Sequence, residues 1–276
     1  MPDEHLHVIP PSIDPWSPKN EPLDPYAAHG ILGHVGLLSV PHDGAGFTRG
    51  DGTPGRIDHF CDVITTGPPP SVDVPLVVQV SRWDRLKDMS GLLRMFADYA
   101  LGDHDAHLLL AGPVVTAVTD DPEGAEVLDE CIEVWRGLPH AERSRIHLAC
   151  LPMADREENA IIVNALQRHA TVVVQKSLAE GFGLTVVEAM LKGRPVLASA
   201  VGGIVDQIDD GETGVLLSDP TDGREFAAAL EGLLGDPERA GRLGRAARES
   251  AIEHHLSDTH LERWLGVLDA MLDARH

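Results

Sequence analysis

The stretch of residues 180–196 constrains the fold of this chain more than any other segment. A glutamate, Glu180, stands before the glycine turn Gly181-Phe182-Gly183. Apolar residues then follow with helical spacing over residues 184–191, and a glycine and a proline end the pattern. The segment therefore predicts a glycine turn that opens a helix, with a second glutamate, Glu188, in the second helical turn.

This turn has the chemistry of a binding site. Unpaired backbone N–H groups and the positive end of a helix dipole suit a phosphate, and two flanking carboxylates suit hydroxyl groups. The combination predicts a sugar nucleotide as ligand, although glycines of a short pattern can also serve close packing alone. The residues expected to contact the ligand here are Glu180, Gly181, Phe182, Gly183, Leu184 and Glu188.

After residue 72, short apolar strands alternate with helices. Strands are expected at residues 76–80, 107–111, 146–149, 171–174, 195–198 and 214–217. Helices are expected at residues 89–100, 126–135, 159–168, 184–191, 205–208, 224–234 and 239–255. This order predicts an α/β fold, a doubly wound parallel sheet of the Rossmann-like kind, whose ligands sit at the carboxyl ends of the strands.

The first part of the chain has a different composition. Prolines and glycines dominate residues 10–70 with little periodicity, apart from an apolar repeat in residues 31–38. We therefore expect residues 1–71 to form an irregular, linker-like segment and residues 72–276 to form the nucleotide-sugar-binding domain.

A loop with three cations directly follows the expected strand at residues 76–80. In the segment 81–88, Arg82 can hold phosphate oxygens through two hydrogen bonds and Lys87 can act as a point charge. Loop cations are often only solvated, but these stand where the ligand crevice is expected. Asp84 and Arg85 are expected to orient neighbours or to face solvent.

Other strand ends add further candidates. Gly112 leaves the backbone open to the crevice, and Leu151 begins a segment expected near the base of the nucleotide. Lys176 precedes Glu180 and is expected to approach a phosphate or to pair with a carboxylate. The pair Gly202-Gly203 is expected to be structural.

These motifs together resemble a known family. Glu180, Gly181-Phe182-Gly183, Glu188 and the closing Gly193-Arg194-Pro195-Val196 are similar to the donor-site signature of retaining GT-B glycosyltransferases, the glycosyl transferases group 1. The segments 8–15, 78–84 and 172–177 narrow the resemblance to trehalose synthases of the glycosyltransferring type and trehalose phosphorylases.

The resemblance implies roles for these residues. Glu180 would bind the donor sugar and stabilise positive charge at its anomeric carbon, and Glu188 would bind the ribose. Arg82, Lys87 and the N–H groups of the glycine turn would stabilise the departing diphosphate. The arrangement requires no metal and no cofactor.

The resemblance also implies a missing part. Residues 10–14 match the crossing from the acceptor-binding domain into the donor-binding domain, and that crossing begins here at residue 10. We therefore expect the partner to be a nucleotide sugar, the acceptor to be glucose or another sugar, and the acceptor site to come from a separate N-terminal half or from a homo-oligomer.

Composition excludes several other classes. With 44 acidic and 22 basic residues the net charge is −22, which argues against nucleic acid and anionic membranes as partners. The three cysteines are widely spaced, and no apolar stretch is long enough to cross a membrane. The start of the chain lacks the pattern of a signal peptide, so a cytoplasmic protein is expected. The 15 histidines show no metal-binding spacing.

Three functions are compatible with the sequence. The first is the donor-binding half of a trehalose-forming, retaining hexosyltransferase. The second is a nucleotide-sugar binding module without transfer activity. The third is another reaction on the same scaffold, such as sugar-nucleotide epimerisation, because a fold alone does not define a function.

Overall fold

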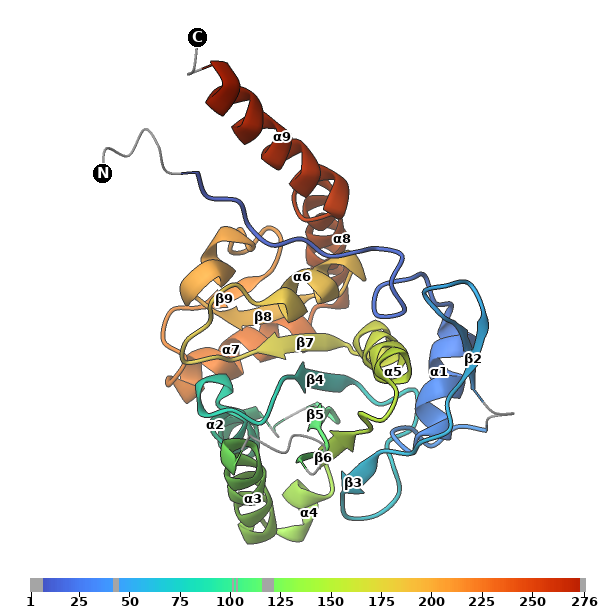
Figure 1. The fold of residues 1–276 in the computed structure, drawn as a ribbon. Helices are drawn as coiled ribbons and strands as arrows, with labels where there is room; N and C mark the ends of the chain where they lie inside the picture. The colour runs from blue at the N-terminus through green and yellow to red at the C-terminus, as the bar shows by residue number, and fades with distance from the viewer. Residues whose placement is uncertain (1–6, 42–44, 101, 103, 116–121, 274–276) are drawn as a thin grey trace.

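A seven-stranded sheet organises the protein. The computed structural model describes residues 7–41, 45–100, 102, 104–115 and 122–273. The strand order is β3-β6-β5-β4-β7-β8-β9 (Figure 1). Neighbouring strands run parallel except β3 and β6, which are antiparallel. The strands are β3 (Asp62–Ile64), β4 (Leu76–Val80), β5 (His107–Pro113), β6 (Ile146–Leu151), β7 (Val172–Gln175), β8 (Val196–Ser199) and β9 (Val215–Leu217). The predicted α/β, doubly wound fold is confirmed.

Helices cover both faces of this sheet, which explains why its central strands are continuous apolar runs. One face is covered by α2 (Met89–Met95), η3 (Phe96–Ala100), α3 (Pro122–Gly137) and α7 (Gly223–Leu234). The other is covered by α1 (Pro25–His34), α5 (Arg156–His169) and α6 (Leu184–Leu191). The remaining helical elements are η2 (Arg85–Lys87), α4 (His140–Arg143), η5 (Gly202–Asp206), α8 (Pro237–His254) and α9 (Ser257–Asp273).

The direction of winding reverses beside β4. From β4 the chain adds β5 and β6 on one side, then crosses to add β7, β8 and β9 on the other. The loops that follow β4 and β7 therefore leave the same edge of the sheet next to each other. In open α/β sheets this reversal point is where ligands bind.

The proline- and glycine-rich N-terminal part contains more regular structure than its composition predicts. Asp24 caps α1 by accepting a hydrogen bond from the Ala27 amide at 2.9 Å, and Ile31 and Leu32 are buried where α1 packs on α5. Strands β1 (Gly46–Thr48) and β2 (Pro54–Arg56) pair with each other, and β3 extends the main sheet. The hydrophobic core thus extends across residue 72, and three-residue strands are too short to show a period in the sequence.

Carboxylates at the start of α5 hold this N-terminal part in place through ion pairs and hydrogen bonds. Arg49 pairs with Asp155 at 2.7 Å and with Glu157 at 3.0 Å, and its hydrogen bond lowers the pKa of Asp155 to about 2. The buried Glu158 accepts hydrogen bonds from the amides of Asp58 and His59 at 2.9 and 2.7 Å. Segment 49–59 is therefore held close to the loop that follows β6.

We predict that Leu32→Ala lowers the free energy of unfolding by about 2–5 kcal/mol, because it leaves a cavity in a core shared with α5. Tyr26→Ala on the same helix is the control, since Tyr26 is 82% exposed and its loss changes stability by less than about 0.5 kcal/mol. Urea unfolding followed by circular dichroism measures both. A Leu32→Ala protein as stable as the wild type would show that α1 is not part of the core.

Candidate functional site

The loops after β4 and β7 meet at the carboxyl edge of the sheet. The Lys87 ammonium forms an ion pair with the Glu180 carboxylate, and both side chains are largely buried, at 16% and 12% exposed. The amide of Leu178 donates to the carbonyl of Leu86 at 2.8 Å. The structure thus brings together two of the residues that the sequence assigned to one site.

A second, deeper ion pair lies beneath this contact. Lys176 is fully buried and pairs with Asp88, the last residue of the β4 loop. Its amide donates to Gln79 Oε1 at 3.0 Å, and Gln79 Nε2 donates to the Lys87 carbonyl at 2.8 Å. Of the two roles expected for Lys176, contact with a phosphate or pairing with a carboxylate, the structure shows the second.

Asp88 holds an uncommon backbone conformation at this point. Its φ is +48°, and it is the one non-glycine residue with positive φ in the described part of the chain. Aspartate tolerates this region better than most residues because its short side chain is polar. Neither Asp88 nor Gln79 was singled out from the sequence, since a lone polar residue near a strand end carries no distinguishing pattern.

Arg82 stands at the outer end of the same loop. Its side chain is 67% exposed and donates to Asp84 Oδ2 at 2.9 Å. Arg85 instead points to α3, where it pairs with Glu126 at 2.9 Å and with Glu130 at 3.4 Å. Arg82 is therefore able to turn towards a ligand at the crevice, whereas Arg85 is engaged elsewhere.

The glycine turn before α6 takes its shape from η5. A Cβ on Gly202, whose φ is +52°, would lie 1.6 Å from the Glu180 carbonyl oxygen. The amide of Gly203 donates to the Gly181 carbonyl at 3.0 Å, and the Gln207 side chain donates to the Phe182 carbonyl. Gly202 is thus required by close contact with the turn, which agrees with the structural role expected of this glycine pair.

The start of α6 is open. Gly183 caps the helix with a φ of +90°, and no side chain accepts its first amides. Leu184, the first helical residue, is 43% exposed, while Phe182 packs edge to face on His255 at 5.9 Å between ring centroids. Among the described residues no side chain therefore caps the N-terminal amides of α6, which lie at the carboxyl edge of the sheet.

Glu188 is buried in α6 and meets the N-terminal part of the chain. Its Oε1 pairs with Lys19 Nζ at 2.8 Å, and its Oε2 has no hydrogen-bond partner among the described residues. Next to it, Lys192 Nζ donates to Asn20 Oδ1 at 3.1 Å and to the Glu188 carbonyl at 3.2 Å, and burial lowers the pKa of Lys192 to about 7. Residues 19 and 20 thus contact the buried end of α6, which sequence spacing could not reveal.

Gly112 and Leu151 lie at the neighbouring strand ends but serve the core. A Cβ on Gly112 would lie 2.5 Å from the Trp83 ring, and the Trp83 indole donates to the Pro113 carbonyl at 2.9 Å. Gly112 thus makes room for the side chain that anchors the β4 loop. Leu151 is buried at 2% exposure.

A pocket of about 480 Å³ opens beside Leu151. Val114, Cys150, Pro152, Met153 and Ala154 form one wall, and the other wall comes from segment 58–62 of the N-terminal part. The lining is mostly apolar, which suits a flat heterocycle. The fixing of segment 49–59 to α5 therefore also shapes this pocket.

Other chemistries find little support in the described residues. Within the described ranges no group of three or more His, Cys, Asp or Glu side chains is placed to hold a metal ion. Burial raises the pKa of the Cys61 and Cys131 thiols to about 12 and that of Cys150 to about 11, so none is a ready nucleophile. No helix in the part of the chain that the structure describes is long and apolar enough to span a membrane.

Comparison with known proteins identifies the family. Residues 156–250 match the family model Glycosyl transferases group 1. Trehalose synthases are 35% identical over 91% of the chain in Rubrobacter xylanophilus and 31% identical over 96% in Pyrococcus horikoshii, matching 49% and 52% of those proteins. The solved sucrose-phosphate synthase of Thermosynechococcus elongatus superposes on 74% of this chain and 47% of its own with a TM-score of 0.60 and 30% identity. The chain spans about half the length of these relatives.

We predict that Asp88→Asn lowers the free energy of unfolding by about 3–5 kcal/mol, because it leaves the buried Lys176 ammonium without a carboxylate. Lys176→Met combined with Asp88→Asn is expected to be more stable than Asp88→Asn alone. Asp84→Asn, on the same loop, is the control and keeps its capping hydrogen bond. Denaturant unfolding of the wild type, Asp88→Asn, Lys176→Met and the double variant measures the coupling, and additive effects of the two substitutions would contradict it.

Proposed function

We propose that the carboxyl edge of the sheet binds a nucleoside diphosphate sugar for hexosyl transfer. The reason is that this chain carries a glycosyl transferases group 1 domain with the fold of a GT-B C-terminal domain. The observation that carries this proposal is the junction of the glycine turn before α6 with the cationic loop after β4. It places helix amides, a carboxylate and cations at one edge of the sheet.

In this proposal the diphosphate lies between the two loops. Arg82, which is 67% exposed, would exchange its contact with Asp84 for the diphosphate, and Lys87 and the open amides of α6 would bind it from the other side. The phosphates would take the place of Glu180 on Lys87, and Glu180 would then accept hydroxyl groups of the sugar. Fixed cations and amides at the leaving group stabilise the charge that develops there, so this arrangement calls for neither a metal nor a cofactor.

The nucleoside is assigned to the neighbouring pocket and to α6. The apolar pocket beside Pro152 and Met153 has the size and lining for a base. Glu188 Oε2 is an acceptor without a partner in the described residues, and we assign it to the ribose hydroxyls. The contact of Glu188 with Lys19 orients the carboxylate in the free protein.

The transfer reaction itself needs an acceptor site. The similarity to trehalose synthases supports glucose as the transferred sugar, glucose or another sugar as acceptor, and a retaining, trehalose-forming reaction. The described residues form one doubly wound sheet, and we assign acceptor binding to a separate N-terminal half or to a second copy of this chain. A nucleotide-sugar binding module without transfer activity is the second candidate.

An exposed apolar stripe on α9 supports a partner. The helix leads away from the sheet beyond α8 (Figure 1). Its large apolar side chains are between 48% and 59% exposed, namely Leu261, Trp264, Leu265, Leu268, Met271 and Leu272. Such a row on one helix is typical of a surface that another protein surface covers.

We predict that calorimetric titration detects binding of at least one of ADP, GDP and UDP and of its glucose conjugate. Arg82→Ala and Glu188→Ala are expected to weaken binding by about tenfold to a hundredfold, the loss of one charge-assisted contact. Arg85→Ala on the same loop is the control, because Arg85 is engaged with α3. Nucleotide binding that is absent, or that both site substitutions leave intact, would refute the site assignment.

We further predict that adding the N-terminal half of a trehalose synthase, with nucleoside diphosphate glucose and glucose, produces trehalose detectable by chromatography. Leu265→Glu together with Leu268→Glu is expected to abolish assembly and product while leaving nucleotide binding unchanged. Glu262→Gln on the same helix is the control. Binding of nucleotide sugar without product under any of these conditions would favour the binding module.

A further inference from the structure

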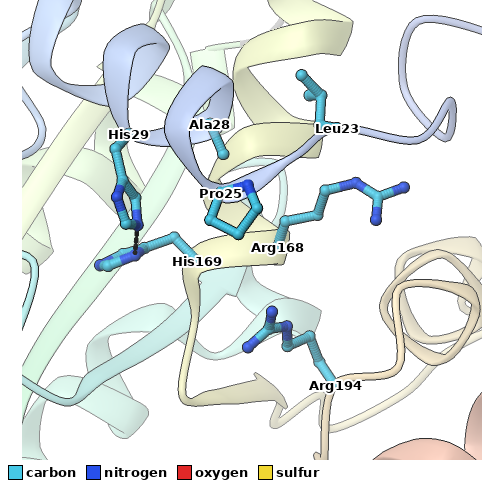
Figure 2. A pocket seen from close by; sticks show the side chains of 7 residues that line it. All are labelled: Leu23, Pro25, Ala28, His29, Arg168, His169 and Arg194. Atoms are coloured by element: carbon cyan, nitrogen blue, oxygen red, sulfur yellow. Dashed lines mark hydrogen bonds between the residues drawn. The ribbon is translucent and has the colours of Figure 1, made fainter.

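A second pocket lies at the opposite edge of the sheet from the donor crevice. It has a volume of about 180 Å³ and is lined by Leu23, Pro25, Ala28, His29, Arg168, His169 and Arg194 (Figure 2). His169 ends α5 just before β7, and Arg194 stands just before β8. Because β7 and β8 run parallel, this pocket is at their amino ends, whereas the donor crevice is at their carboxyl ends.

Positive charge is concentrated here in a chain of net charge −22. Neither Arg168 nor Arg194 has an ion pair with any residue that the structure describes. Burial lowers the pKa of both guanidinium groups; at Arg168 the charges of Arg194 and Arg248 add to this effect, and the Glu21 carboxylate opposes it. Removing a cation from water without an ion-pair partner is costly, and this applies most to Arg194, so an anion in this pocket would relieve an existing electrostatic penalty.

The donors in the pocket are only partly used. Arg194 Nη1 donates to the Ala170 carbonyl at 3.2 Å, but its Nε has no acceptor within the described structure. His169 Nδ1 contacts His29 Nε2 at 3.2 Å, and His169 Nε2 likewise lacks a partner there. Figure 2 shows the Arg194 guanidinium reaching towards His169 from below Pro25. A fork of N–H groups next to imidazole nitrogens is a geometry that suits a tetrahedral oxyanion.

Arg168 supports the site from the other end. Its guanidinium turns towards the N-terminal part of the chain, where it donates to the carbonyls of Asn20 and Glu21 at 3.1 and 2.8 Å and to Asn164 Oδ1 at 2.9 Å. The Glu21 carboxylate lies near enough to offset part of its charge, but it forms no ion pair with Arg168. Arg168 therefore contributes charge, and Arg194 with the two histidines contributes contacts.

We propose that this pocket binds a small oxyanion of the phosphate class, either inorganic phosphate or the phosphoryl group of a phosphomonoester. The volume is below that of pockets that enclose drug-sized ligands, so it takes the oxyanion itself and leaves an ester group outside. The four-residue strand β7 separates it from the donor crevice by roughly 13 Å, so the two sites are distinct. An occupant would join α1, α5 and the loop before β8, and would stabilise the N-terminal part on the sheet.

Side-chain NMR of ¹⁵N-labelled histidine tests this proposal, because His29 and His169 report from inside the pocket. Inorganic phosphate is titrated at fixed pH and matched ionic strength against chloride, and a hexose phosphate is titrated in parallel. We expect saturable shifts of both histidines. Tighter binding of the hexose phosphate identifies a phosphomonoester as the ligand, and equal binding identifies free phosphate.

Arg194→Gln is expected to weaken the response by about tenfold or more, and Arg194→Lys by less, since the ammonium keeps the charge but not the fork. Arg242→Gln, an exposed arginine on α8, is the control. Arg194→Lys keeps the test valid if Arg194→Gln does not fold. Histidine signals that stay unchanged in the wild type, or a response that Arg194→Gln retains in full, would overturn the proposal. Either result is independent of nucleotide binding, which depends on Arg82 and Glu188.

Discussion

The buried ion pair between Lys176 and Asp88 is the interaction on which the donor crevice depends. An ammonium group that is fully removed from water requires a close carboxylate, and Asp88 supplies it from the end of the other loop. This requirement fixes the end of the β4 loop against the start of the β7 loop. Gln79 adds hydrogen bonds to both loops from the strand below. Lys87 and Glu180 meet at the ends of the same two loops, so their geometry depends on this buried contact.

Sequence reasoning found the sheet and the two loops because these leave clear patterns. Strands buried on both faces are continuous apolar runs, and β4 was predicted at its observed bounds. A residue type alone does not report its surroundings, however. The sequence does not distinguish a Lys176 that contacts phosphate from one that pairs with Asp88. Gly112 was expected to leave its backbone open to a ligand, but in the structure the Trp83 ring occupies the space beside it. Strand β3 and residue Lys19 depend on contacts far along the chain, which no local spacing encodes.

Local clusters of cations would allow this strongly acidic chain to bind anionic ligands. The field of a net charge of −22 opposes an approaching phosphate, but salt screens exposed charges beyond roughly 8 Å at physiological ionic strength. Inside a pocket the nearest charged groups therefore determine whether an anion binds. Arg82 and Lys87 lie at the carboxyl edge of the sheet, and Arg168 and Arg194 lie at the amino edge. Each pair is placed where backbone or imidazole N–H groups add directional contacts, so neither site needs a basic protein surface.

The ion pair between Lys87 and Glu180 gives the proposed donor site a defined order of events. In the free protein each group compensates the charge of the other in a place that is mostly dry. In the proposed site a diphosphate that binds Lys87 would replace the carboxylate, and Glu180 would then be an anion without an ion-pair partner beside the sugar. Its charge is compensated again only when positive charge develops at the anomeric carbon, so the cost of separating this pair is recovered in the transition state rather than on binding. Donor binding would thereby release Glu180 from its ion pair so that it can act in catalysis. This role requires a rigid turn before α6. The contacts of the turn with Gly202, Gly203 and Gln207 provide that rigidity.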